Sequence, residues 1–97
     1  MDVVSFRESL TADTPPDEAS VYLKALWYDA KDQWDAAHSL IQDVEDKNSS
    51  WIHAYLHRKE GDISNAAYWY RRAGKKMPDI TLEKEWQNMV ADLINVD

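Results

Sequence analysis

The feature that most constrains the fold is an internal repeat, in which residues 25–44 align with residues 54–73 when the chain is shifted along itself. Both segments carry alanine at the same two points and a large side chain one helical turn away. The aligned pairs include Ala25 with Ala54, Tyr28 with His57, Asp32 with Gly61, Ala37 with Ala66, and Ile41 with Tyr70. Two helices approach closely only where a small residue lies between them, so each segment is predicted to be a helical hairpin with its alanines at the crossing.

Apolar residues recur every three or four positions along the rest of the chain as well, which predicts an all-α fold without strands. The predicted helices span about 15–30, 33–46, 50–60, 63–75 and 81–95. Their bounds follow from capping residues, which are Thr14 before two prolines, Asp32, Asp62 and Thr81 at helix starts and Gly61 at a helix end. Short links between consecutive helices predict that neighbours are antiparallel.

The 97 residues are expected to form one domain, because a chain of this length supports one hydrophobic core. Its predicted parts are an N-terminal arm (1–14), a first hairpin (15–46), a second hairpin (50–78) and a capping helix (81–95). Within the arm, Ser5-x-x-Glu8 either caps a short helical turn or is part of an extended segment. The last helix is expected to cover the second hairpin, because repeat arrays usually need a third unit. A homodimer, if one forms, is expected through that helix or Trp69.

Composition excludes several classes of protein. There is no cysteine, so neither a disulfide nor a thiolate metal site is expected, and a reducing, cytoplasmic location is favoured. No stretch approaches the roughly 18 apolar residues of a membrane span. The sequence has no glycine-rich phosphate loop, no cysteine nucleophile and no serine elbow motif. Neither enzymatic activity nor a cofactor is therefore predicted.

Charge is distributed unevenly along the chain. The net charge is −7, which predicts no binding to nucleic acid, because phosphate affinity depends on accumulated positive charge. Residues 57–76, however, hold six basic and two acidic residues, a local net charge of +4. This basic stretch is either a solvated face or a docking surface for an acidic protein or peptide segment.

The second repeat carries a recognisable pattern. Gly61-Asp62 is followed by Ala66-x-x-x-Tyr70-x-x-Ala73-x-x-x-x-Pro78, and Ala54 stands in the preceding helix. Over residues 15–78 this pattern resembles the tetratricopeptide repeat (TPR) family, with Asp32 in place of the turn glycine in the first unit. The stretches HAYLHRKEGD and NAAYWYRRA also resemble those of small bacterial proteins without an assigned activity. The family resemblance implies a right-handed stack of helical hairpins that binds proteins or peptides and performs no catalysis.

Candidate partner-binding residues combine arginine with aromatic side chains on the second hairpin. They are Trp51, Tyr55, Arg58, Trp69, Arg71 and Arg72. Arginine pairs with carboxylates through two hydrogen bonds and aromatic residues anchor interfaces, so this set predicts a protein-interaction module for an acidic segment. Trp69 falls on a polar helical stripe, so it is either covered by the last helix or partly exposed as an anchor.

A second hypothesis concerns a metal- or ligand-binding helical protein and rests on His53 and His57. The two histidines are four residues apart, which places them on one helical face at the spacing of metal ligands. The glutamate of an HExxH motif is missing between them, and a structural role in packing is the competing explanation. His38 adds a third ligand only if the second helix faces the third at that point.

Overall fold

The computed structural model describes residues 1–96, and within this range it contains six α-helices, one 3-10 helix and no strand. The elements are α1 (Val3–Glu8), the 3-10 helix Ser9–Thr11, α2 (Val21–Ala30), α3 (Trp34–Ile41), α4 (Lys47–Glu60), α5 (Ile63–Ala73) and α6 (Leu82–Leu93). The prediction of an all-α fold is confirmed. None of the helices in the described range is long and apolar enough to cross a membrane.

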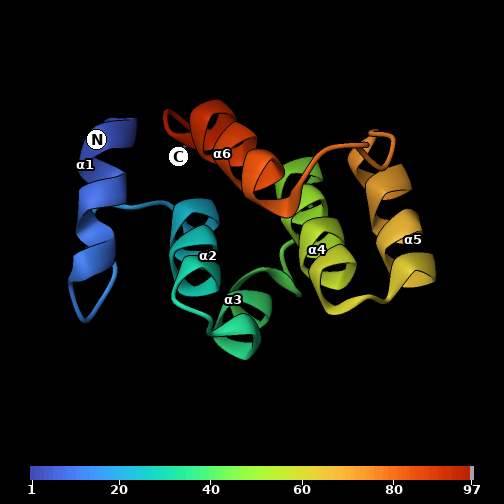
Figure 1. Ribbon diagram of the computed structural model, residues 1–97, viewed down its shortest axis with the longest axis horizontal. Coiled ribbons are helices and arrows are strands. Elements are labelled where there is room, and N and C mark those ends of the chain that lie inside the picture. Colours follow the sequence, from blue (N-terminus) through green and yellow to red (C-terminus); the bar gives the residue numbers. More distant parts are fainter. Residues whose placement is uncertain (97) are drawn as a thin grey trace.

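The helices form two consecutive antiparallel pairs with α6 laid across them. Helix α2 packs on α3 and α4 packs on α5, while α3 and α2 contact α4 (Figure 1). Helix α6 contacts α2 and α4, the first helix of each pair, so it covers both hairpins rather than the second alone. The Trp86 indole of α6 donates a hydrogen bond to the Leu26 carbonyl of α2 (3.0 Å), which joins the chain's end to its first hairpin.

The two hairpin links have the same backbone geometry, as the internal repeat predicts. Gly61 has a φ of 88° and Asp32, its aligned counterpart, has a φ of 60°. In each link the next residue's amide donates to a carbonyl five residues earlier, from Gln33 to Tyr28 and from Asp62 to His57, both at 2.9 Å. Asp32 was expected to cap the next helix, but it closes the previous one, because aspartate tolerates the left-handed conformation better than most residues.

The first hairpin begins later than predicted. Thr14 does not cap a helix, because each residue that precedes a proline is driven away from helical backbone, and Pro15 itself precedes Pro16. The chain instead makes a turn, with the Ala19 amide donating to the Pro16 carbonyl (3.1 Å). The side chain of Ser20 then accepts from the Leu23 amide and starts α2.

The N-terminal arm is helical and packs against the core. Asp2, not Ser5, caps α1, and its carboxylate accepts from the Ser5 amide at 2.7 Å. Phe6 is fully buried, with its ring centroid 6.1 Å from that of Trp86. The Trp27 indole donates to the Ser9 carbonyl, so the segment after α1 is held against α2.

Other helix ends differ from the predicted ones too, including the end of α6, which lies at Leu93 rather than at 95. Helix α3 stops at Ile41, and α4 begins at Lys47 because the Asp46 carboxylate, rather than a serine, accepts from the Ser49 amide (2.7 Å). Helix α5 ends before Gly74, whose φ of 74° gives a third left-handed helix end, which the sequence analysis missed. The start of α6 is as predicted, with Thr81 as its cap.

The alanines of the repeat lie where close helix packing requires them. All four are completely buried, and they are Ala25, Ala37, Ala54 and Ala66. Around them lie the largest buried side chains, among them Trp27, Leu26, Ile52, Leu56, Tyr70 and Met89. This confirms the predicted core of the hairpins, while the TPR-like, right-handed character of the array stays a prediction.

Enlarging one of these alanines is expected to destabilise the protein. Ala66→Leu places extra methyl groups where α5 meets α4, and such overpacking costs about 1 to 3 kcal/mol of unfolding free energy. Urea denaturation followed by circular dichroism measures this loss. Ala91→Leu on the exposed side of α6 is the control and is expected to change little. An unchanged stability for Ala66→Leu would contradict the close crossing.

Candidate functional site

The structure buries two of the residues that were expected to face a partner. Tyr55 is 3% exposed and its hydroxyl donates to Asp29 Oδ2 at 2.9 Å, so the residue packs in the core and offers little surface to a partner. Trp51 is 7% exposed, and its indole N–H donates to Glu85 Oε2 at 3.2 Å. Trp51 can therefore contact a partner only through the part of its ring that borders the surface.

Arg58 is also engaged inside the protein. Its guanidinium donates to Glu85 Oε1 at 2.8 Å and to the Ile80 carbonyl. Only 16% of its side chain is exposed. Because the planar fork of Arg58 is already used for internal hydrogen bonds, this arginine is not free to pair with a partner's carboxylate.

The outer face of α5 keeps the other candidates at the surface. Arg71 and Arg72 are exposed, and Trp69 is half-buried. The Arg72 guanidinium lies 5.0 Å from the Trp69 ring centroid and donates to the Tyr68 hydroxyl at 3.1 Å. The His53 ring of α4 stacks on Trp69, with 3.9 Å between the ring centroids, and Trp69 stays half-buried.

A cavity adjoins this face at the C-terminal end of α5. Its volume is about 280 Å³, and it is lined by Trp51, Lys75, Lys76, Pro78, Ile80, Glu85 and Asn88. The Lys75 ammonium lies 4.0 Å from the Trp51 ring centroid. The cavity therefore combines an aromatic wall and an apolar rim with two lysines, which the sequence analysis counted only as part of a basic stretch.

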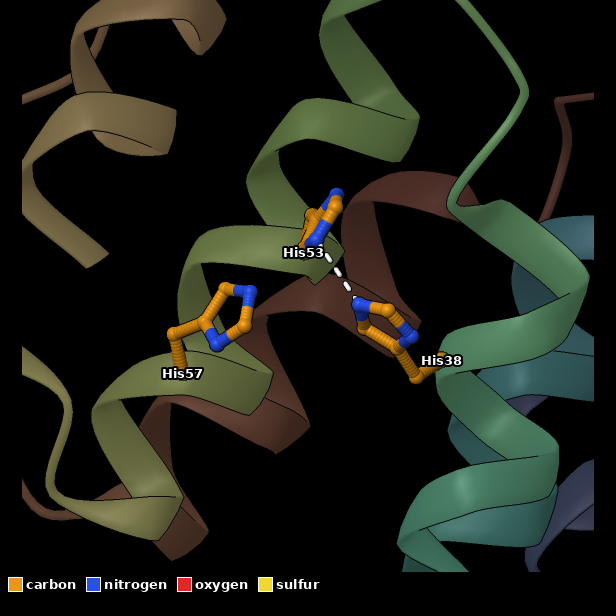
Figure 2. Close-up of side chains that lie close together, drawn as sticks. All are labelled: His38, His53 and His57. Atoms are coloured by element: carbon orange, nitrogen blue, oxygen red, sulfur yellow. Dashed lines mark hydrogen bonds between the residues drawn. The ribbon is translucent and has the colours of Figure 1, made fainter. Parts of the chain in front are cut away.

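The three histidines of the chain come together between α3 and α4. His38 projects from α3 toward His53 and His57 of α4, as Figure 2 shows. His38 Nε2 and His53 Nε2 are 2.9 Å apart. One ring nitrogen from each histidine lies within 4.8 Å of the others. The condition for a third ligand, that the second predicted helix faces the third at His38, is met.

Burial favours the neutral form of two of these imidazoles, His38 and His53. It lowers the pKa of His53 to about 4, with smaller contributions from the neighbouring His38 and His57. Burial also lowers the pKa of His38, and His57 acts in the same direction. At neutral pH both rings therefore carry an unprotonated nitrogen that can accept a hydrogen bond or a metal ion.

Glu85 is a buried carboxylate that the sequence analysis missed. It is 2% exposed and accepts from Trp51, Arg58 and Tyr70. A signal for it was present, because Glu85 lies four and eight residues before Met89 and Leu93 and therefore falls on the apolar stripe of α6. A glutamate on such a stripe predicts a buried carboxylate with partners.

Fold and site together define an all-α protein of two helical hairpins with a basic, aromatic face on α5 and a histidine cluster between α3 and α4. Comparison with protein-family models, curated proteins and solved structures found no match. The resemblance to the TPR family therefore stays a prediction from the sequence.

Proposed function

We propose that this chain is a small helical interaction module that binds an acidic segment of another protein. The binding surface, called the basic face below, consists of Arg71, Arg72, Lys75 and Lys76 together with the cavity beside Trp51. The proposal includes a cytoplasmic location and no catalysis. The resemblance of residues 54–78 to a protein-binding repeat family supports it from the sequence side.

The observation that carries the proposal is the unpaired charge of the basic face. The ion pairs within residues 1–96 use Arg58, Lys59 and His57, and none of them uses the four cations of this face. The chain as a whole has a net charge of −7, so this face is a local positive region on an acidic molecule. Such an asymmetry orients an acidic partner toward α5 and repels it from the rest of the surface.

The cavity provides an apolar anchor site, which the charged side chains alone do not. Exposed ion pairs are screened by salt and contribute about 0 to 1 kcal/mol each, so binding needs an apolar anchor. The wall formed by Trp51 and the rim formed by Pro78 and Ile80 can receive one apolar side chain of the partner. Acidic residues on either side of that anchor then lie near Lys75, Lys76 and the arginines of α5.

A fluorescent peptide of glutamates flanking a single leucine tests this proposal, with anisotropy as the measurement. The double variant Lys75→Glu/Lys76→Glu is expected to weaken binding about tenfold or more, because it reverses the charge at the cavity. Arg72→Lys is expected to weaken binding several-fold, because lysine lacks the planar fork although it keeps the charge. Raising the salt concentration should weaken the wild type more than the charge-reversed variant.

The control is Arg7→Glu, a reversal of one charge at an exposed position of α1, which lies at the opposite end of the molecule from α5 (Figure 1). It is expected to alter the affinity far less than the lysine pair does. If the peptide binds all of these variants equally, or does not bind the wild type, the basic face is an ordinary solvated surface.

A further inference from the structure

The histidine cluster joins two helices through ring nitrogens that face one another. The chain has three histidines and all of them are in this cluster. Their ring centroids lie 4.6 Å apart for His38 and His53, 4.8 Å for His53 and His57, and 5.5 Å for His38 and His57. Each residue is therefore in direct contact with both others (Figure 2).

The hydrogen bonds of His57 leave one of its nitrogens available. His57 Nδ1 is 2.6 Å from Glu60 Oε2, and because the carboxylate can only accept, Nδ1 carries the proton and donates it. In a neutral His57 ring the Nε2 atom then carries no proton, and the Asn65 side-chain amide nitrogen lies 3.4 Å from it, in place to donate a hydrogen bond. A carboxylate that orients a histidine in this way is the usual outer partner of a metal-ligating imidazole.

Aromatic rings wall the cluster on both sides. Trp69 of α5 stacks on His53 with an angle of 17° between the ring planes. Trp34 of α3 stacks on His38, with 4.8 Å between centroids and an interplanar angle of 10°. The Trp34 indole also donates to the Leu56 carbonyl at 2.8 Å, which holds α3 against α4 beside the cluster. The rings are thus fixed in position, with His53 and His57 buried and His38 half-buried.

We propose that His38, His53 and His57 form a binding site for one divalent transition metal ion of the zinc class. The site goes beyond the proposed interaction with an acidic segment and does not depend on it. Three neutral imidazoles with a fourth position left for water or another donor is a known coordination pattern for zinc.

The distances suit such an ion after a small rearrangement. Tetrahedral zinc bonds to nitrogen at about 2.0 to 2.1 Å, which sets the ligand nitrogens about 3.3 Å apart. In the structure one pair is 2.9 Å apart and all three ligand atoms lie within 4.8 Å. Rotations of the imidazole rings about their side-chain bonds can supply the difference. The ion replaces the hydrogen bond between His38 Nε2 and His53 Nε2. The Nε2 that donated this bond passes its proton to the Nδ1 of the same ring. Each imidazole stays neutral, so metal binding at neutral pH requires no net release of protons.

The donor set also decides which ions fit. Imidazole nitrogen suits zinc, copper, nickel and cobalt, whereas magnesium and calcium prefer oxygen ligands. A second group, consisting of His57, Glu60 and Asp62, brings its ligand atoms equally close, but both acids are exposed. The buried group is favoured because its ligands are held by packing on both sides, and the two groups are distinguished by experiment.

The experiment is a titration of the full chain with Zn²⁺ by calorimetry, with Mg²⁺ as the control ion. We expect one Zn²⁺ per chain, no binding of Mg²⁺, and a melting temperature that rises by roughly 10 °C or more when free Zn²⁺ exceeds the Kd a hundredfold. Cobalt is the second probe, because Co²⁺ held by three imidazoles gives the visible absorption bands of a four-coordinate ion.

The variants locate the ion. His38→Gln removes a half-exposed ligand, so the fold is retained, and we expect at least a tenfold weaker affinity for Zn²⁺ and loss of the cobalt bands. Glu60→Gln is expected to weaken binding by about 10- to 100-fold through the orientation of His57. Asp62→Asn is expected to leave the affinity unchanged. No Zn²⁺ binding by the folded wild type would overturn the proposal, and so would binding that survives His38→Gln but is lost in Asp62→Asn.

Discussion

Replacing Glu85 by alanine is expected to lower the free energy of unfolding by about 3 to 5 kcal/mol, the largest effect of any single substitution considered for this protein. The carboxylate is buried and accepts hydrogen bonds from Arg58 (2.8 Å), Trp51 (3.2 Å) and Tyr70 (2.7 Å). Its removal leaves the Arg58 charge without a partner and two buried donors unsatisfied. Burial, with Glu85 as a smaller cause, raises the pKa of the Tyr70 hydroxyl, so Tyr70 remains a donor.

Urea denaturation measures this loss of stability. Two further variants serve as comparisons. Glu85→Gln keeps an oxygen acceptor without the charge and is expected to fall between wild type and alanine. Asp92→Ala removes an exposed carboxylate from the same helix and is expected to change stability by no more than about 0.5 kcal/mol. A loss below about 1 kcal/mol for Glu85→Ala would place this group among ordinary surface ion pairs and contradict the buried network.

Acidification is expected to destabilise the metal-free protein through His53. The ordinary pKa of histidine is 6.5, and burial lowers that of His53 to about 4 in the folded state. Between these values the unfolded chain binds a proton at this residue and the folded chain does not. The stability contributed by the neutral ring is therefore complete above about pH 6.5 and is lost as the pH falls toward 4. The loss amounts to something on the order of 3 kcal/mol.

The measurement is the free energy of unfolding in a chelator between about pH 7 and pH 4, for the wild type and for His53→Gln. His38, His57 and the acids Glu60 and Asp35 lie around His53, and burial lowers the pKa of His38 as well. The difference between the two proteins isolates His53. The variant is expected to show a clearly smaller decline with falling pH, and parallel curves for the two proteins would show that His53 is not held neutral by the fold.

Local signals in the sequence were sufficient where one or two adjacent residues decide the conformation. Gly61 ends α4 and Thr81 starts α6, because a left-handed φ and a side-chain cap are properties of single residues and their nearest neighbours. The same signals misled where two of them competed. Two consecutive prolines offered a helix start at Thr14 and also a barrier to helical backbone, and the barrier prevailed.

The candidate residues on the second hairpin also divide into those whose position a local pattern predicts and those whose position depends on distant partners. Arg71 and Arg72 lie at the surface because they fall on the polar side of α5, which the helical period alone predicts. Arg58 and Tyr55 were predicted to lie at the surface. Instead, Arg58 bonds to Glu85 of α6 and Tyr55 bonds to Asp29 of α2. A periodic pattern assigns a residue to one side of a helix, but it cannot tell which distant partner will cover that side.

By itself the sequence determined the helical class, the division into two hairpins and the alanines at their crossings. These depend on the helical period and on side-chain volume, both of which act over a few residues. Only the tertiary structure decided that His38 meets His53 and His57, that Glu85 gathers three donors, and that α6 covers both hairpins. Each of those contacts joins residues far apart in the chain. Their formation depends on how whole helices pack against one another, which is set by the summed burial of the core rather than by any local pattern.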